Sequence, residues 1–485
     1  MFLSKTDFML AEDCVKALWL KKNRKDLDEE IDAEQQKIMS TGNQVQELAR
    51  AYFPNGVMVP ADNWDVINGS EITKELAQKH DVLYEAFARM DNGAFCRIDI
   101  LKRNKKAWDL IEIKATNRVK EEHLPDLAFQ KYVFENAGYP VKECYVLHLN
   151  KDYKKHGKIN VRKLFKLEKV SEDVKEYGIN TPVKVEQYIK FQQQESELSV
   201  LLHKGCLDCK YFYYCGKNLP SYSIFNLLNK READVFYAET GKFEIKDLPA
   251  SVCKNKFQLI EREAFLTGQV HVEKEGIKKW LKKLKYPLYY LDYETVMEAI
   301  PRFDDAWPYE QVPFQFSLHI QQKKDGPVKH VSFLHKEKSD PRRALAEFLV
   351  KNCGDKGSVI VYFEDFEKAR NKELADLFPD LHDQIIAIND RVVDLLEPFD
   401  YRYLYSPKQV SSASIKKVLP AFTDLSYQNL GIHDGSEAAT RYELFLNGKL
   451  SKKEEQTLFD DLEKYCGQDT YAMVLLINVL YKYIS

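Results

Sequence analysis

The sequence predicts two consecutive α/β domains that are joined by a polar segment. Residues 1–216 mix helical periodicity with short strands, and from residue 286 onward strands are followed by helices. The polar residues 217–285 between them are interpreted as a helical connector. With 485 residues and 44% hydrophobic side chains, the chain can fill several cores, which excludes a disordered or fibrous protein. We therefore expect domains at residues 1–216 and 286–485.

The elements of the first domain follow from hydrophobic spacing. Residues 27–53 carry apolar side chains, the first of them Ile31, at helical intervals. Residues 95–113 predict a β-hairpin, because two apolar strands flank a short polar turn. A helix is expected at residues 123–137, since Gly138 ends the helical pattern.

The second domain is predicted from three apolar strands and one long helix. Strands are expected at residues 288–293, 314–320 and 359–363, and an amphipathic helix at 453–483. Strands followed by helices favour an α/β fold for this part of the chain as well.

The near-zero net charge excludes the attraction of polyanions by the electrostatic field of the whole chain. The chain has 72 Lys and Arg against 75 Asp and Glu, so nucleic acid must be bound by local patches. Basic residues gather at 102–106, 151–169 and 278–285, where a solvated surface is the alternative. No run of 18 uncharged apolar residues occurs, so we expect a cytoplasmic protein without a membrane partner. Phosphate-binding loops and dinucleotide motifs have no support in the sequence.

The predicted hairpin carries acids and a lysine at positions that suit metal-dependent hydrolysis. Asp99 shares one strand face with Arg97, and Glu112 shares one face of the returning strand with Lys114. Two carboxylates on adjoining strands can hold Mg²⁺ or Mn²⁺, while the lysine orients or deprotonates the water that attacks a phosphodiester. The alternative is an ordinary ion pair across the hairpin.

The order of these residues resembles the RecB-like type of PD-(D/E)xK nuclease, a restriction-endonuclease-like fold. Glu85 precedes Asp99, and Gln130 lies on the helix after Lys114, in the order that this family uses. The resemblance implies metal ligation by Glu85, Asp99 and Glu112. It also implies that Lys114 is the catalytic lysine and that Gln130 orients the substrate.

Two positions depart from the pattern of that family. Many relatives have a metal-binding His where this chain has Gln46, four residues after Gly42, and a Tyr where it has Phe134. An amide is a poorer Mn²⁺ ligand than imidazole. The first departure favours an alternative in which only the C-terminal site is active and the first domain binds nucleic acid as a platform.

Three clustered cysteines predict a metal site. Cys206, Cys209 and Cys215 follow the pattern Cys-x2-Cys-x5-Cys, and Cys14 is the candidate fourth ligand. Three clustered ligands with one distant ligand are unusual for a zinc ribbon and suit a cubane held by four thiolates. Zinc and unligated thiols remain alternatives. The other five are expected to be small buried apolar residues: Cys96, Cys144, Cys253, Cys353 and Cys466.

The cysteine arrangement also carries a resemblance. The segment from Ser4 through Cys14, combined with the cluster at 206–215, resembles the iron-sulfur nucleases of the CRISPR-associated and AddB kinds. This implies a structural [4Fe-4S] cluster that joins the two ends of the nuclease domain.

A second set of acids lies in the C-terminal part. Asp292 and Glu294 stand two apart on one face of a predicted strand. Tyr465 and Asp469 stand four apart on one face of the last helix. Glu367 begins a helix after the strand at 359–363.

In this order the residues resemble the DEDDy branch of the DnaQ-type, RNase H-like exonucleases. The resemblance implies that Tyr465 positions the attacking water, and that four acids bind two metal ions: Asp292, Glu294, Glu367 and Asp469. Glu367 stands where Asp is commoner and Phe363 where many relatives have Asn, so Asp365 and Asp394 are fallback ligands. His433 is expected to be structural.

Together these observations predict a Mg²⁺- or Mn²⁺-dependent nuclease with two active sites and a [4Fe-4S] cluster. The C-terminal site is expected to be a 3′-to-5′ exonuclease, with DNA favoured over RNA and a role in DNA repair, CRISPR or phage defence. The platform hypothesis above is the first alternative. A non-catalytic adaptor in a nucleic-acid-processing complex is the second.

Overall fold

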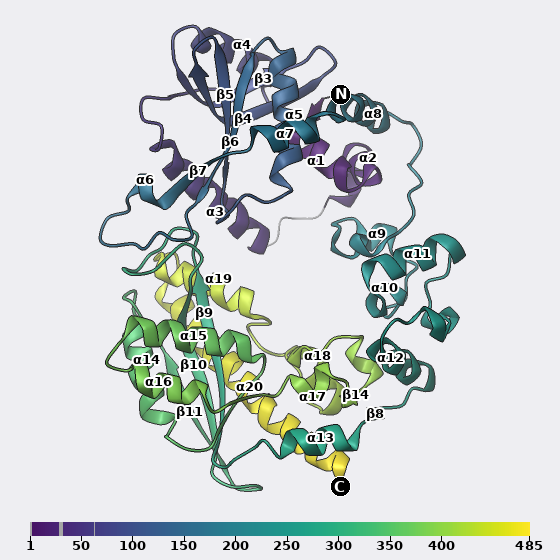
Figure 1. Ribbon diagram of the computed structural model, residues 1–485, viewed down its shortest axis with the longest axis vertical. Coiled ribbons are helices and arrows are strands. Elements are labelled where there is room, and N and C mark those ends of the chain that lie inside the picture. Colours follow the sequence, from purple (N-terminus) through teal and green to yellow (C-terminus); the bar gives the residue numbers. More distant parts are fainter. Residues whose placement is uncertain (1, 29–32, 63) are drawn as a thin grey trace. The chain divides into compact units, whose positions relative to one another are not determined.

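The computed structural model describes residues 2–28, 33–62 and 64–485, and the chain divides into two compact units (Figure 1). Unit 1 comprises Met1–Val200 with Glu298–Glu310, and unit 2 comprises Leu201–Met297 with Gln311–Ser485. Each unit combines helices with a β-sheet, which confirms the predicted α/β class. None of the described helices has the length and apolar composition needed to cross a bilayer.

Unit 1 is built on a seven-stranded sheet in the order β2-β3-β4-β5-β6-β7, with β1 pairing to β4. The strands are β1 (Leu3–Ser4), β2 (Val57–Met58), β3 (Val82–Arg89), β4 (Ala94–Asn104), β5 (Ala107–Lys114), β6 (Val141–Leu149) and β7 (Phe165–Lys169). β4 and β5 pair antiparallel and form the predicted hairpin, whereas β5 pairs with β6 in parallel. Strands β3, β4 and β5 are therefore neighbours in the sheet, and they carry the predicted acids Glu85, Asp99 and Glu112.

Helices bury both faces of this sheet. They are α1 (Lys5–Asp13), α2 (Val15–Asn23), α3 (Ala33–Arg50), α4 (Val66–Ala77), α5 (His123–Asn136), α6 (Val161–Leu164), α7 (Ser171–Gly178) and α8 (Thr181–Gln192). Phe8 of α1 stacks on Phe129 of α5 in one apolar cluster, and Val45 of α3 belongs to a second. The predicted helices at 27–53 and 123–137 are confirmed as α3 and α5, while Ile31 lies outside the described residues.

Residues 298–310 belong to unit 1, although they were expected in the second domain. Ala299 joins the apolar cluster that contains Ile113. The Nζ of Lys155 lies 2.6 Å from the carboxylate of Asp304, and Tyr309 donates a hydrogen bond to the carbonyl of Ala115. These contacts explain why the segment between β9 and β10 groups with the first sheet.

Unit 2 is built on a five-stranded sheet in the order β11-β10-β9-β12-β13. The strands are β9 (Leu288–Met297), β10 (Gln311–Gln321), β11 (Val328–Leu334), β12 (Ser358–Val361) and β13 (Val392–Asp394). β9, β10 and β11 pair antiparallel, and β12 pairs in parallel with both β9 and β13. The predicted strands are confirmed, and β9 is the central one.

The helices of unit 2 include the predicted long C-terminal helix. They are α14 (Arg342–Asn352), α15 (Glu364–Leu377), α16 (His382–Asn389), α17 (Glu397–Asp400), α18 (Ile415–Phe422), α19 (Gly435–Leu446) and α20 (Lys452–Ile484). The Ser451 hydroxyl and the Glu454 carboxylate form a capping box at the start of α20. Leu291 and Tyr293 of β9 pack in the apolar cluster with residues of α14, α15 and α16. The alternate residues of β9 consequently point to the opposite face of the sheet, which contacts α20.

The segment expected as a connector is helical and has a core of its own. It contains α10 (Ile224–Leu227), α11 (Lys230–Thr240), α12 (Lys256–Thr267), β8 (His271–Val272) and α13 (Lys274–Leu281), with β8 paired to β14 (Leu404–Tyr405). Phe225 and Phe236 are buried at the centre of its apolar cluster. Unit 2 includes this segment and also residues 201–216, which were expected in the first domain.

Candidate functional site

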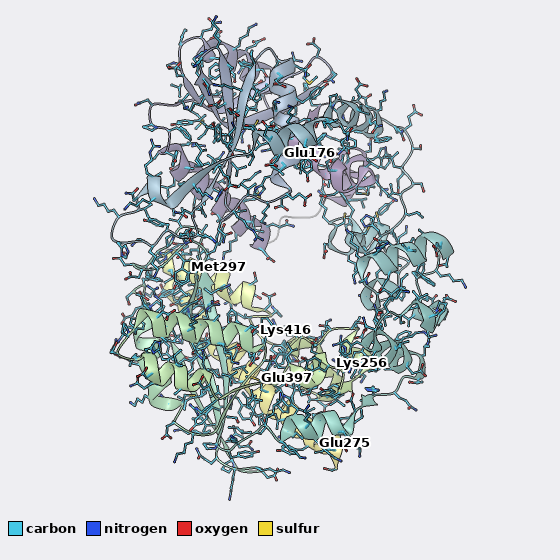
Figure 2. All side chains as sticks on the ribbon, viewed as in Figure 1. Glu176, Lys256, Glu275, Met297, Glu397 and Lys416 are labelled. Atoms are coloured by element: carbon cyan, nitrogen blue, oxygen red, sulfur yellow. The ribbon has the colours of Figure 1, made fainter. Side chains whose placement is uncertain are left out.

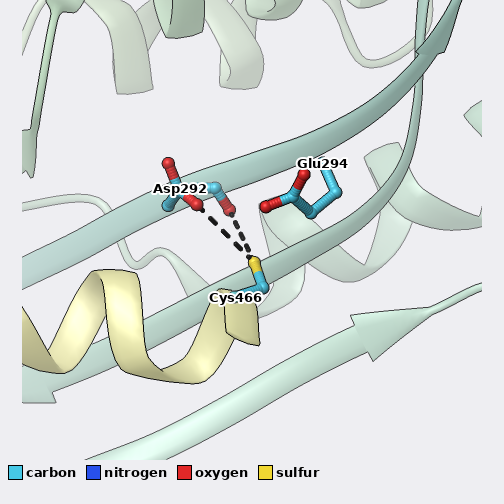
Figure 3. A group of neighbouring side chains, drawn as sticks. All are labelled: Asp292, Glu294 and Cys466. Carbon is cyan, nitrogen blue, oxygen red and sulfur yellow. Dashed lines mark hydrogen bonds between the residues drawn. The ribbon is translucent and has the colours of Figure 1, made fainter. Parts of the chain in front are cut away.

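The central strand of unit 2 presents two acids to the C-terminal helix. Asp292 and Glu294 lie two apart on β9, so their side chains share the face that contacts α20. The Sγ of Cys466 lies 3.7 Å from both the backbone oxygen and the Oδ2 of Asp292 (Figure 3). Among the described residues, Asp292, Glu294 and Cys466 form a group whose potential ligand atoms all lie within 4.8 Å of one another.

The long helix α20 adds Asp469 and Tyr465 to this cluster. Both are buried, and the hydroxyl of Tyr427 donates a 2.6 Å hydrogen bond to Oδ1 of Asp469. The ring of Tyr427 lies 6.2 Å from that of Tyr465. Burial raises the pKa of the Tyr465 hydroxyl, and the nearby charges of Asp469, Glu294 and Asp292 raise it further. The structure thus brings Tyr465 and the three acids together.

Glu367 supplies the fourth acid from α15. Its side chain is buried, its Oε2 has no hydrogen-bond partner, and burial followed by the charge of Asp292 raises its pKa. Asp394, a fallback ligand, instead accepts hydrogen bonds from the backbone N–H groups of Phe363, Glu364 and Leu396. Asp365, the other fallback ligand, is exposed. The geometry therefore favours Glu367, as the sequence resemblance implied.

The four acids of unit 2 lack basic partners among the described side chains. None of them forms an ion pair within the part of the chain that the structure describes. Burial and the neighbouring carboxylates raise the pKa values of Asp292 and Glu294, and burial raises that of Asp469 to about 6. Buried carboxylates that are neither paired nor protonated are costly, so this donor set fits divalent cations.

A basic cavity of about 270 Å³ lies beside the acids, and Tyr427 lines it. Its lining includes Lys408, Lys416 and Lys417, two of them on α18. Lys416 (Figure 2) lies 5.3 Å from the ring of Tyr465. Burial raises the pKa values of Asp292 and Asp469, and the charge of Lys416 acts in the opposite direction. Tyr427 and these lysines were missed in the sequence, where only the pair Lys416-Lys417 gave a signal.

The acids predicted in unit 1 also come together. Lys114 Nζ lies 3.0 Å from Oε1 of Glu112, and Gln130 donates a 3.0 Å hydrogen bond to Oε2 of the same carboxylate. Asp99 accepts a 2.6 Å hydrogen bond from the backbone N–H of Ile113. Glu85, on the neighbouring strand, has a φ of 56°, a left-handed conformation that is rare for a residue within a strand. The hairpin, β3 and α5 hence meet at one polar cluster, as predicted.

Internal cations pair with most acids of this cluster. The carboxylate of Glu85 lies 2.9 Å from Arg50 and 2.9 Å from Arg97. Lys5 of α1 lies 2.7 Å from Glu112, and Lys114 lies 2.6 Å from Asp126 on α5. Glu85, Glu112 and Asp126 therefore each have a basic partner, whereas Asp99 forms no ion pair among the described residues.

Gln46 occupies the centre of the unit 1 cluster as a donor. Its Nε2 lies 2.6 Å from Oε1 of Glu85 and 2.6 Å from Oδ1 of Asp99. Burial raises the pKa of Glu112, but the charges of Lys114 and Lys5 outweigh this effect, so the pKa is lowered overall. Burial and the charge of Glu112 raise the pKa of Asp99 to about 7. The amide thus bridges two acids at the position where relatives have a metal-binding histidine.

Lys5, Arg50 and Asp126 were not recognised in the sequence. Asp126 stands one helical turn before Gln130, which donates to it at 2.8 Å, so its i,i+4 spacing was an available signal. Lys5 is 107 positions from Glu112, and no local pattern connects them.

The clustered cysteines lie in unit 2, on η2 (Lys204–Asp208) and α9 (Phe212–Cys215) and between them. Cys206, Cys209 and Cys215 are half-buried and form no disulfide. Cys14 belongs to unit 1, between α1 and α2. The four-thiol site stays a prediction.

Comparisons with known proteins show that part of the chain is similar to a family without an assigned activity. Residues 289–414 match a family described as a domain of unknown function (DUF2779), and this range contains Asp292, Glu294 and Glu367. An uncharacterized protein of Mycoplasma genitalium is 30% identical over 220 residues, which cover 41% of this chain and 33% of the relative. An uncharacterized protein of Mycoplasma pneumoniae is 27% identical over 51% of this chain and 40% of its own length. The chain thus spans well under half the length of these curated relatives.

Proposed function

We propose that this chain is a metal-dependent nuclease whose second unit removes nucleotides from the 3′ end of a nucleic acid, with DNA favoured. The observation that carries the proposal is a group of four carboxylates on β9, α15 and α20, three of them buried and Asp292 half-buried, which form no ion pairs among the described residues. The lysine-lined cavity beside it supports a polyanionic substrate, because ammonium groups next to acids attract phosphate to a site that would otherwise repel it.

The residues of unit 2 have distinct roles in this proposal. Asp292, Glu294, Glu367 and Asp469 would hold Mg²⁺ or Mn²⁺, which would activate water and stabilise the leaving 3′ oxygen. Tyr427 fixes the orientation of Asp469 through its hydrogen bond. Tyr465 would orient the attacking water through its hydroxyl, and Lys416 and Lys417 would hold the backbone of the strand.

For unit 1, the internal cations favour the platform role over a second active site. Lys5, Lys114, Arg50 and Arg97 already pair with the carboxylates, so a metal ion would have to displace ammonium and guanidinium groups. Lys163 and Lys166 line a cavity of about 500 Å³ within the predicted basic segment 151–169. Such a surface suits phosphate binding. A second nuclease site at Glu112 and Lys114 is the alternative.

We also propose that Cys206, Cys209 and Cys215, with Cys14 as the fourth ligand, hold a structural [4Fe-4S] cluster. The spacing of the half-buried thiols supports this, because they lie on or next to two short helices that contact each other. Protein purified without oxygen should contain iron. If the purified protein contained stoichiometric zinc and no iron, the four thiols would form a zinc site instead of a [4Fe-4S] cluster.

Cleavage assays with end-labelled single-stranded and double-stranded DNA and RNA test the nuclease proposal. The full chain should shorten a 3′-labelled strand stepwise when Mn²⁺ is present, Asp292→Asn should stop this, and Glu112→Gln should retain it. Loss of cleavage in Glu112→Gln alone would move the active site to unit 1. No cleavage of any substrate with either metal would favour the non-catalytic adaptor.

A further inference from the structure

Cys466 lies inside the acid cluster of unit 2, although it was expected to be a small apolar residue. Its side chain is fully buried, and its Sγ lies 3.7 Å from Oδ2 of Asp292 (Figure 3). The ligand atoms of Asp292, Glu294 and Cys466 all lie within 4.8 Å of one another. By contrast, Cys353 of the same unit is buried in the apolar cluster beneath α14.

Two further observations indicate that this group is open to a ligand. Glu294 is 6% exposed, and within the described residues its carboxylate forms no hydrogen bond or ion pair. The neighbouring Glu367 is 2% exposed, and its Oε2 has no hydrogen-bond partner. Buried carboxylates without partners are rare in folded proteins, because their desolvation is not offset.

We propose that Asp292, Glu294 and Cys466 bind a thiophilic divalent cation, Zn²⁺ foremost, in competition with the Mg²⁺ or Mn²⁺ of the proposed nuclease site. Two carboxylate oxygens and one thiolate supply three ligands of types that Zn²⁺ takes, and water can complete its four-coordinate site. Mg²⁺ prefers an all-oxygen set, so the sulfur discriminates between the metals. Binding releases the thiol proton of Cys466 to solvent, and no electron is transferred.

If the nuclease proposal holds, this competition makes Zn²⁺ an inhibitor. Both metals would use Asp292 and Glu294, so the zinc-bound site could not hold the pair of hard cations. The binding inference itself is independent of catalysis, because it concerns only the affinity of these three side chains for a metal.

Direct binding measurements on the full chain test the site. Zn²⁺ is titrated against bound Mn²⁺, whose electron paramagnetic resonance signal appears when the ion is released. Loss of the sulfur ligand in Cys466→Ser should weaken Zn²⁺ relative to Mn²⁺ by at least about tenfold, the lower end of the loss seen when even residues that only support a ligand are removed. Cys353→Ser is the matched control and should match the wild type.

Cobalt provides a second readout that does not depend on Mn²⁺. Co²⁺ bound by Cys466 gives a thiolate-to-cobalt charge-transfer absorption, and the other cysteines contribute equally to wild type and variant. The charge-transfer absorption of Cys466→Ser should therefore be lower than that of the wild type by the contribution of one thiolate. Glu294→Gln keeps the thiol and should also weaken Co²⁺ and Zn²⁺, which covers the case in which Cys466→Ser fails to fold.

The outcomes separate the zinc site from the nuclease. An unchanged Zn²⁺-to-Mn²⁺ affinity ratio in Cys466→Ser, or an unchanged cobalt spectrum, overturns the zinc site even if the protein cleaves DNA. A chain that cleaves nothing but shows the absorption that depends on Cys466 keeps the zinc site and rejects the nuclease.

Discussion

The two units each bury a group of carboxylates between a sheet and a helix, but only unit 1 supplies the cations. In unit 1, Glu112 contacts Lys5 and Lys114, and Glu85 contacts Arg50 and Arg97. In unit 2 the acids form no ion pairs among the described residues, and Lys416 acts on them only from a distance. Two acid clusters that both resemble nuclease motifs in the sequence therefore differ in whether basic side chains of the protein balance their charge.

The difference shows that an acid motif alone does not define a metal site. A cluster balanced by Lys and Arg is stable without added ions, whereas a buried cluster of unpaired acids must be protonated or bind cations. The raised pKa values of Asp292, Glu294 and Glu367 and the lowered pKa of Glu112 express the same contrast. Asp99 of unit 1, which forms no ion pair among the described residues, is the exception, because burial and the charge of Glu112 raise its pKa.

The largest expected effect is on nucleic-acid cleavage. Asp292→Asn removes the central acid of unit 2, and we expect the rate of 3′-end shortening to fall by at least roughly 100-fold, since even residues that only support a metal ligand cost up to that much. Gel analysis of labelled strands measures the rate. Asp365→Asn, at an exposed acid of α15, is the matched control and should retain the wild-type rate.

Glu112→Gln should reveal the structural role of the unit 1 cluster. The change leaves Lys5 and Lys114 partly unpaired, so we expect the free energy of unfolding to fall by about 2 kcal/mol, below the usual cost of breaking a buried pair because Asp126 still contacts both lysines. Denaturant titration of the metal-free chain measures it. The contrast would fail if Asp292→Asn, which removes an unpaired acid, destabilised the metal-free chain as much.

The pH dependence of stability should have opposite signs at Asp469 and Glu112. The folded chain holds the proton of Asp469 up to a pKa of about 6, above the ordinary 3.8, so this residue makes the metal-free chain less stable as pH rises from about 4 to 6. Asp469→Asn should flatten this decline, by an amount on the order of 2 kcal/mol. Glu112, whose pKa is lowered, contributes stability above its ordinary pKa of 4.5 that is lost in more acidic solution. Thermal unfolding at several pH values would contradict this if Asp469→Asn kept the wild-type slope.

The smallest effect concerns the basic cavity. Lys417→Ala should raise the KM for a strand a few-fold and reduce the salt dependence of binding by about one unit of slope, because one phosphate contact is lost. Lys351→Ala, at an exposed lysine of α14, serves as the control. Equal effects of the two changes would show that only general charge matters.

The sequence predicted those parts of the fold and site that depend on local patterns. Strand alternation placed Asp292 and Glu294 on one face, and helical spacing placed Tyr465 beside Asp469. The partners that distinguish the clusters depend on tertiary packing. Lys5 contacts Glu112 across 107 positions and Tyr427 contacts Asp469 across 42, so sequence periodicity does not predict these two contacts.

Tertiary packing also determines the position of Cys466 and the boundaries of the units, which local sequence patterns do not predict. Cys466 follows the apolar pattern of α20, and only the register of β9 against that helix places it beside Asp292. Residues 298–310 join unit 1 because Asp304 and Tyr309 bond to it, although the strands on either side belong to unit 2.

Mn²⁺ binding to the full chain, followed by electron paramagnetic resonance, tests the contrast between the clusters most directly. We expect Mn²⁺ sites that disappear in Asp292→Asn and persist with unchanged affinity in Glu112→Gln, because all four acids of unit 2 lack ion pairs among the described residues, whereas Glu112 pairs with Lys5 and Lys114. Binding that persists in Asp292→Asn and disappears in Glu112→Gln would show that unit 1 holds the metal and would contradict this contrast.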